Sequence, residues 1–192
     1  RTPISSAGYV ISNSGSYYLT SNLVSTGHGI VIETSGVTVD LMGFSLTGDG
    51  DNDDYGIHVA GATNALIDKV VIKGGTVSGF FRGLQCDYMN NSRIEQMVVS
   101  GNNSYGVYLD GDNSGQCDGN TISDCTISGN GDDGVHLNGS NFGQCNGNTI
   151  SDSTISENGF EGVYLSGDEG QCDGNTISDC TIRGNASKGV FL

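Results

Sequence analysis

Apolar and polar residues alternate in a short pattern that returns along most of the chain: a glycine, an apolar residue, a variable residue and a second apolar residue. Alternation with a period of two is typical of a β-strand, because successive side chains point to opposite faces. The pattern begins at Gly29, Gly56, Gly83, Gly106, Gly134, Gly162 and Gly189, which lie 27, 27, 23, 28, 28 and 27 residues apart. A nearly constant period in the twenties predicts a solenoid, in which each repeat packs against its neighbours.

Three later repeats are nearly identical, so their inward and outward positions can be assigned. The phrase GQCDGNTISDCTISGN begins at Gly115, and close copies begin at Gly143 and Gly170. We expect Ile122 and Ile127 to point into the core, while the flanking Thr and Ser residues point out. Three short strands per repeat, with turns rich in Gly and Asn, predict an all-β parallel β-helix. Spacing alone does not determine its hand.

The first half of the chain carries a more specific resemblance. The segments Tyr9-Val-Ile-Ser-Asn-Ser-Gly-Ser-Tyr-Tyr-Leu, Gly29-Ile-Val-Ile and Val37-Thr-Val-Asp-Leu-Met-Gly are similar to the start of bacterial secreted right-handed parallel β-helix repeat proteins. The later Asn-Thr-Ile-Ser phrases resemble the generic repeat of this pectate-lyase-like superfamily. The resemblance implies a right-handed solenoid of about seven coils of 23–28 residues, secreted or held at the cell surface. Characterised members mostly bind or cleave polysaccharides, so a polysaccharide is the expected partner.

We expect one continuous domain with two parts. Residues 1–28 do not keep the period, and their strands are expected to cap the first coil and cover its open edge. Residues 29–192 are expected to form the coils, the last of which has no such cap. Either the chain is cut from a longer solenoid, or the open coil is buried by another chain, in a homo-oligomer or an end-to-end assembly.

Composition and charge narrow the classes of partner. The formal net charge is −15, with seven basic residues against 22 acidic ones. Nucleic acid is excluded as a partner because its phosphates require Lys and Arg. No apolar run approaches the length of about 18 residues that a membrane span needs. The acidity favours a cation-rich exterior, and it would repel a polyuronate unless metal ions bridged the two.

Aromatic residues gather at the outward position of the repeated strand. His58, Tyr108, Tyr164 and Phe191 occupy this position in different coils, and Tyr105 lies beside it. Rings with polar neighbours suit sugars, which present apolar C–H faces and hydroxyl edges. We therefore predict that these residues bind a polysaccharide. Two alternatives remain open, since such rings also stabilise neighbouring strands or mark a subunit interface.

The same surface contains the best candidates for catalysis. Asp133 and Glu161 occupy equivalent positions one coil apart, and His136 lies beside them. Paired carboxylates are the usual machinery of a glycoside hydrolase. The Gly-Asp-Asp segment that ends at Asp133 resembles one element of the polygalacturonase site, whose other elements the sequence lacks. A hydrolase, or a polysaccharide lyase that uses a basic residue, is thus an alternative to simple binding.

One acidic segment could hold calcium. Asp49, Asp51, Asp53 and Asp54 alternate in a short loop, and carboxylates spaced in this way can surround a hard cation. The segment lacks the distal glutamate of a helix–loop–helix calcium site, so a simply hydrated loop is the alternative reading.

Two further repeating features remain. Cysteines recur at Cys117, Cys145 and Cys172 and at Cys125 and Cys180, without the C-x₂-C spacing of a metal site. We expect buried thiols that fill the core, although neighbouring coils could bring two thiols near disulfide distance. Regular Thr and Ser rows on the outward strands also suggest a structural, self-assembling or ice-binding solenoid as a second alternative.

Overall fold

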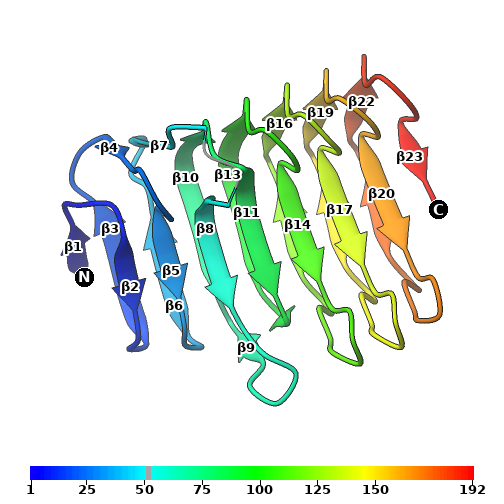
Figure 1. Ribbon diagram of the computed structural model, residues 1–192, viewed down its shortest axis with the longest axis horizontal. Helices are drawn as coiled ribbons and strands as arrows, with labels where there is room; N and C mark the ends of the chain where they lie inside the picture. The colour runs from blue at the N-terminus through cyan, green and yellow to red at the C-terminus, as the bar shows by residue number, and fades with distance from the viewer. Residues whose placement is uncertain (51–52) are drawn as a thin grey trace.

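A computed structural model describes residues 1–50 and 53–192, and in this part of the chain every regular element is a β-strand. The strands form three rows that run the length of the molecule, with the N-terminus at one end and the C-terminus at the other (Figure 1). The front row contains β2 (Tyr9–Ile11), β5 (Ile30–Ile32), β8 (Tyr55–Ala60), β11 (Arg82–Asp87), β14 (Val107–Asp110), β17 (Val135–Asn138), β20 (Val163–Ser166) and β23 (Val190–Phe191).

The other two rows are joined, because two long strands extend through both. The second row contains β1 (Thr2–Ile4), β3 (Gly15–Leu19), β6 (Val37–Asp40), β10 (Val71–Ser78), β13 (Arg93–Ser100), β15 (Thr121–Ser123), β18 (Thr149–Ser151) and β21 (Thr176–Ser178). The third row contains β4 (Leu23–Val24), β7 (Ser45–Thr47), the ends of β10 and β13, β16 (Thr126–Ser128), β19 (Thr154–Ser156) and β22 (Thr181–Arg183). A short pair, β9 (Ile67–Asp68) and β12 (Met89–Asn90), lies between the front and second rows.

All of these strand pairs are parallel and keep the register that the repeat predicts. Val107 pairs with Val135, which pairs with Val163, and Ile122 pairs with Ile150. These side chains are buried, and burial of each contributes about 1.5–3 kcal/mol to folding. Each coil therefore closes its core against the next one. The predicted all-β parallel β-helix is confirmed.

The chain adopts unusual backbone conformations at the corners between the rows of strands. Asp124, Asp152 and Asp179, at the bend between the second and third rows, have φ of 54°, 50° and 53°. Aspartate tolerates this left-handed region better than most residues. At Gly106 a Cβ would lie 2.6 Å from the Gly134 carbonyl oxygen, so only glycine allows the coils to approach there.

Two stacks of buried asparagines run from coil to coil along the solenoid, and the sequence analysis did not predict them. We call each stack a ladder, because each asparagine is hydrogen-bonded to the equivalent one on the next coil. In one ladder the Asn130 Oδ1 accepts hydrogen bonds from the Asn102 backbone N–H at 3.2 Å and from its Nδ2 at 2.9 Å. Asn130 in turn donates from Nδ2 to Asn158 Oδ1 at 3.0 Å. Asn120 and Asn148 repeat the arrangement elsewhere in the coil. The ladders satisfy buried backbone groups where the chain turns.

The first 28 residues do more than cap the solenoid. β2, β3 and β4 pair in parallel with β5, β6 and β7, so they form a first coil of their own. Only β1 lies beyond this coil, where it covers the edge of β3. The irregular spacing hid this coil because its loops are shorter than those of later coils.

All six cysteines are described, and all are free thiols. Cys117 and Cys145 are fully buried on neighbouring coils, as expected of core-filling residues. Their Sγ atoms contact carbonyl oxygens of the surrounding backbone, including the Cys117 oxygen 3.4 Å from the Cys145 Sγ.

Candidate functional site

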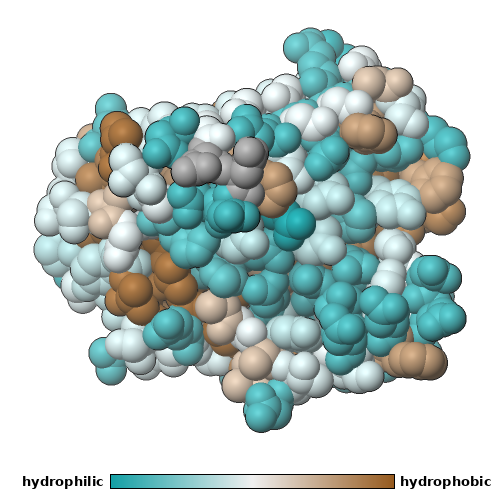
Figure 2. Space-filling view, in the orientation of Figure 1, coloured by the Kyte–Doolittle hydropathy of each residue, from teal (hydrophilic) through white to brown (hydrophobic). Residues whose placement is uncertain are grey.

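The most distinctive surface lies on the outward face of the front row. Two columns of side chains run along it, one just before each coil's glycine and one at the middle of each strand. We call the following residues the stripe: His28, Tyr55, His58, Arg82, Gln85, Tyr105, Tyr108, Asp133, His136, Glu161, Tyr164, Lys188 and Phe191. Figure 2 shows this face, which is hydrophilic over its middle and has apolar patches toward both ends.

The rings of the later coils form an unbroken series. The His136 ring lies 4.9 Å from both Tyr105 and Tyr108, measured between ring centroids. Tyr164 follows at 4.6 Å from His136, and Phe191 at 5.0 Å from Tyr164. Parallel strands place successive outward side chains about 4.8 Å apart, so the spacing follows directly from the register. The predicted series of rings is thus present along four coils.

Arg82 connects this series to a second group of rings. His28 stacks on Tyr55 at 5.0 Å, and Tyr55 meets His58 at 5.1 Å. The Arg82 guanidinium lies 5.9 Å from the Tyr55 centroid and 4.4 Å from that of Tyr108. At these distances the guanidinium and the rings attract one another through cation–π contacts. Rings therefore continue from the first coils to the last, with Arg82 between the two groups and Lys188 over the ring of Phe191.

The Arg82 side chain still has hydrogen-bonding capacity. Its Nη1 donates to the Gln85 Oε1, but its buried Nε has no hydrogen-bond partner. A buried N–H without an acceptor costs about 1–3 kcal/mol. Among the described residues no other buried side-chain nitrogen or oxygen lacks a partner. Arg82 lies at the centre of the stripe, between the two groups of rings.

The structure brings the three predicted catalytic residues together, and their catalytic role stays a prediction. Asp133 and His136 are buried, and the Asp133 Oδ2 lies 2.9 Å from His136 Nδ1. The Asp133 Oδ1 accepts a hydrogen bond from the Glu161 backbone N–H at 2.9 Å. Each oxygen of Asp133 thus has a partner within the protein, and one of these contacts orients the His136 ring. The Glu161 carboxylate accepts from Ser187 Oγ at 2.7 Å and is more exposed.

A row of polar residues at the ends of the strands was missed by the sequence analysis. Asp87, Asp110 and Asn138 occupy the same position on β11, β14 and β17. Asp87 Oδ2 lies 2.7 Å from His58 Nε2, and Asp87 Oδ1 accepts a hydrogen bond from Gln85. These residues edge the stripe with oxygens. Their spacing by one repeat is the signal that could have found them.

Burial changes the ionisation of this edge. Burial above all, then the nearby charge of Asp112, raises the pKa of Asp110 from its usual value near 3.8 to about 6. The Asp110 Oδ1 accepts a hydrogen bond from Asn138 Nδ2 at 3.0 Å, and the same amide donates to the Tyr108 hydroxyl. Burial also raises the pKa of the Tyr105 and Tyr108 hydroxyls, so both stay protonated donors.

We expect Asp110→Asn to stabilise the protein at pH 7. Because the folded-state pKa exceeds the unfolded one, the folded state holds more protons between about pH 4 and 6, and the free energy of unfolding falls as pH rises through this window. The difference between the folded-state and unfolded-state pKa of Asp110 lowers the free energy of unfolding at pH 7 by at most about 3 kcal/mol, and solvent screening reduces this loss to about 1–2 kcal/mol. Urea unfolding at pH 4 and pH 7 measures it. The exposed Asp168→Asn is the control, and equal pH dependence in both variants would contradict the assignment.

The predicted calcium loop is only partly described. Asp51 lies outside the described residues, and Asp49, Asp53 and Asp54 are on either side of it. Asp54 Oδ1 lies 3.5 Å from His28 Nδ1, at the edge of the stripe. The calcium site stays a prediction.

The Thr rows are in register. Thr121, Thr149 and Thr176 pair on the second row, and Thr126 pairs with Thr154 on the third. The Ser128 row is less regular, since Ser156 is buried and Arg183 takes the next place. These hydroxyls lie on a different face from the stripe, so the two surfaces can be tested separately.

Comparisons with known proteins agree with the fold. A family model described as "Periplasmic copper-binding protein (NosD)" matches residues 42–192. Among solved structures, the Dettilon tailspike protein (gp208) is similar with a TM-score of 0.52 and 12% sequence identity, over 98% of this chain and 52% of that chain. This chain thus spans about half the length of the tailspike chain. A search of curated proteins finds no match.

The copper of the family description does not fit the described side chains. No group of three or more His, Cys, Asp or Glu residues in the described ranges is arranged to hold a metal ion. Hydrogen bonding with the Cys117 and Cys172 thiols, together with burial, raises the pKa of Cys145, and burial raises that of Cys86, whereas the hydrogen bond with Cys145 lowers the pKa of Cys172. Copper binds the thiolate rather than the thiol.

The described residues, 1–50 and 53–192, contain no helix that is long and apolar enough to span a bilayer.

Proposed function

The chain belongs to the NosD family of right-handed parallel β-helix proteins, and we propose that it is a module that recognises a polysaccharide along the stripe. The observation that carries the proposal is the unbroken series of rings from Tyr105 to Phe191, extended by Arg82 to His28 and Tyr55. The planes of neighbouring rings are tilted by 29° to 73°, and His136 is buried between its neighbours. The exposed parts of the tyrosine and phenylalanine rings therefore offer a row of apolar contacts to successive sugar rings.

Polar groups beside the rings can fix the orientation of a bound sugar. Asp87 and Asp110 provide acceptors along one edge, and Glu161 provides them along the other. Polar groups of this kind orient a ligand that is held mainly by ring contacts. With a net charge of −15, the surface favours a neutral glycan over a polyuronate, unless calcium bridges the two.

A second candidate function is enzymatic. The buried Asp133 carboxylate fixes the Nδ1 side of His136, which leaves Nε2 as the free nitrogen of the ring. An oriented imidazole of this kind can act as a general base, as in hydrolases that use a His–Asp pair. A glycoside hydrolase or polysaccharide lyase that acts at the stripe would use His136 in this way, with Glu161 as the accessible carboxylate.

The setting of the protein is also a proposal. The matching family is described as periplasmic, so we propose that the chain acts outside the cytoplasm. Self-association through the last coil and ice binding by the Thr rows remain separate possibilities. The Thr rows have the regular register that an ice-binding surface requires.

A panel of soluble and insoluble polysaccharides, tested with and without calcium, separates these functions. The same mixtures are assayed for released reducing ends and for unsaturated products. Binding without products supports a recognition module. Products that disappear in His136→Gln support the enzyme, and their chemistry distinguishes hydrolysis from elimination. If no polysaccharide binds, the proposed function is wrong, and ice-shaping assays on Thr121→Lys and Thr149→Lys become the next step.

A further inference from the structure

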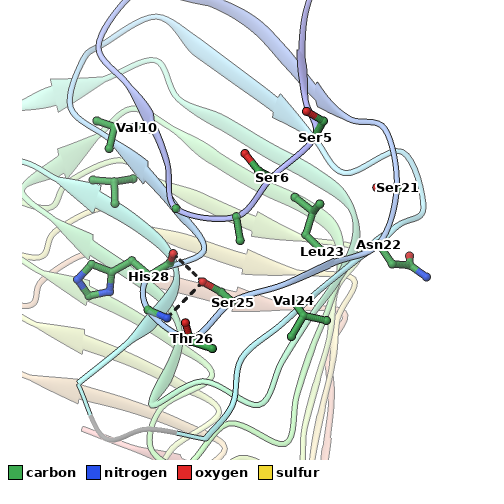
Figure 3. Close-up of a pocket in the computed structure, with 14 residues that line it drawn as sticks. Ser5, Ser6, Val10, Ser21, Asn22, Leu23, Val24, Ser25, Thr26 and His28 are labelled. Atoms are coloured by element: carbon green, nitrogen blue, oxygen red, sulfur yellow. Dashed lines mark hydrogen bonds between the residues drawn. The ribbon is translucent and has the colours of Figure 1, made fainter.

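A hollow lies at the N-terminal end of the stripe. It has a volume of about 850 Å³ and is formed by two segments of the first coil, 5–10 and 21–28, together with Val31. In Figure 3, Ser5 and Ser6 come from one segment, while Asn22, Leu23 and Val24 come from the other. The volume falls in the range of about 300–1,000 Å³ that is typical of small-molecule sites.

The lining of the hollow is unlike the rest of this acidic protein. Hydroxyl groups of Ser and Thr and the amide of Asn22 alternate with valines, and no Asp, Glu, Lys or Arg contributes to it. Val10 is 51% exposed and Val24 is 75% exposed, so apolar surface is available to a ligand. Hydroxyl and amide groups match the hydroxyls of a sugar, and valine side chains match its C–H face.

His28 joins the hollow to the stripe. Its ring stacks on Tyr55 and lies 5.7 Å from His58, while the Tyr55 backbone N–H donates to its Nδ1 at 3.0 Å. Its backbone oxygen accepts a hydrogen bond from Ser25 Oγ at 3.0 Å, shown as a dashed line in Figure 3. Ser25 is buried in the wall of the hollow. A chain of sugars that lies along the rings would therefore reach the hollow at its end.

We propose that the hollow is the terminal subsite of the glycan surface and holds the last one or two rings of a neutral oligosaccharide. This inference rests on the proposed function of the stripe. Because the lining has no Lys or Arg, it offers a uronate no salt bridge from these side chains, while its hydroxyl, amide and valine groups match a neutral sugar. The valines contact the faces of the ring, and the hydroxyl groups of Ser5, Ser6 and Thr26 bind its edge.

The test uses gluco-, manno- and xylo-oligosaccharides of one to eight units, with galacturonate oligomers as the charged comparison. Val24→Asp places a charge in the hollow at an exposed position, and Val98→Asp, on the outward face of β13, is the matched control. We expect Val24→Asp to raise the Kd of the longest bound neutral oligomer at least about tenfold. Val98→Asp should leave the Kd unchanged, and Val10 and Val24 methyl resonances should shift on titration of the wild-type protein.

The outcomes separate the subsite from the stripe. If Tyr105→Ala/Tyr108→Ala weakens binding while Val24→Asp does not and the valine methyls stay unmoved, the subsite is wrong and the stripe function stands. If neither variant weakens the binding of any oligomer, or no oligomer binds, the proposed function itself is wrong. Tighter binding of the galacturonate series than of the neutral series at the hollow would also overturn the subsite.

Discussion

Replacing Asn130 by alanine should lower the free energy of unfolding by about 3–5 kcal/mol. The side chain is 2% exposed and takes part in four hydrogen bonds, two from Asn102 and two to Val99 and Asn158. Alanine would leave the Asn102 N–H, the Asn102 amide and the Val99 oxygen without their partner inside the core. Each such buried group costs about 1–3 kcal/mol, and the truncated side chain leaves a cavity as well.

Asn103→Ala provides the matched control for this prediction. Asn103 follows Asn102 in the chain, one coil before Asn130. Its exposed amide donates only to the Gly50 oxygen. We expect a change within about 0.5–1 kcal/mol there, measured by urea unfolding with circular dichroism. If Asn130→Ala destabilised the protein no more than Asn103→Ala, the ladder would not be a structural element of the solenoid.

The double substitution Tyr105→Ala/Tyr108→Ala should weaken glycan binding by at least about 2 kcal/mol, or roughly 30-fold in Kd. These rings lie at the junction between Arg82 and His136, where both halves of the stripe meet. Their loss interrupts the series of rings and removes two of the four rings that lie near the Arg82 guanidinium. Isothermal titration calorimetry with the tightest polysaccharide of the panel measures the effect.

Two controls make this result interpretable. Tyr108→Phe keeps the ring and loses only the hydroxyl that accepts from Asn138, so we expect a loss of less than about tenfold. Thr126→Ala removes an exposed side chain on another face and should leave the Kd unchanged. Thermal melts of each variant exclude loss of fold, since Tyr108 is half-buried. Equal affinity of the double variant and Thr126→Ala would place the glycan elsewhere.

Much of the fold could be predicted because the same strand pairing and side-chain packing recur in each coil of a solenoid. The inward positions of Val107 and Ile122 follow from alternation and spacing alone, and the structure places both in the core. The buried role of Asn130 could not be predicted in the same way, since asparagine next to glycine usually indicates an exposed turn. The ladder becomes visible only when coils are stacked, so that one amide meets the next.

The candidate site, too, could be predicted only in part from the sequence. The positions of Tyr108 and His136 on one face follow from the register, but the burial of His136 depends on rings from the coils on either side. The hydrogen bond between the Asp133 carboxylate and His136 Nδ1 depends on side-chain direction at a corner. The raised pKa of Asp110 could not be predicted, because it comes from burial and from Asp112, neither of which a repeat pattern reveals.

The most direct test of the account maps the contact surface on the intact protein. Tyrosine-ring and threonine-methyl resonances are followed by NMR while the tightest polysaccharide of the panel is added in fragment form. We predict that the ring signals of Tyr105, Tyr108 and Tyr164 shift with one common Kd, and that the methyl signals of Thr126 and Thr154 stay in place. Shifts confined to the threonine methyls, with unmoved tyrosine rings, would contradict the claim that the stripe binds the glycan.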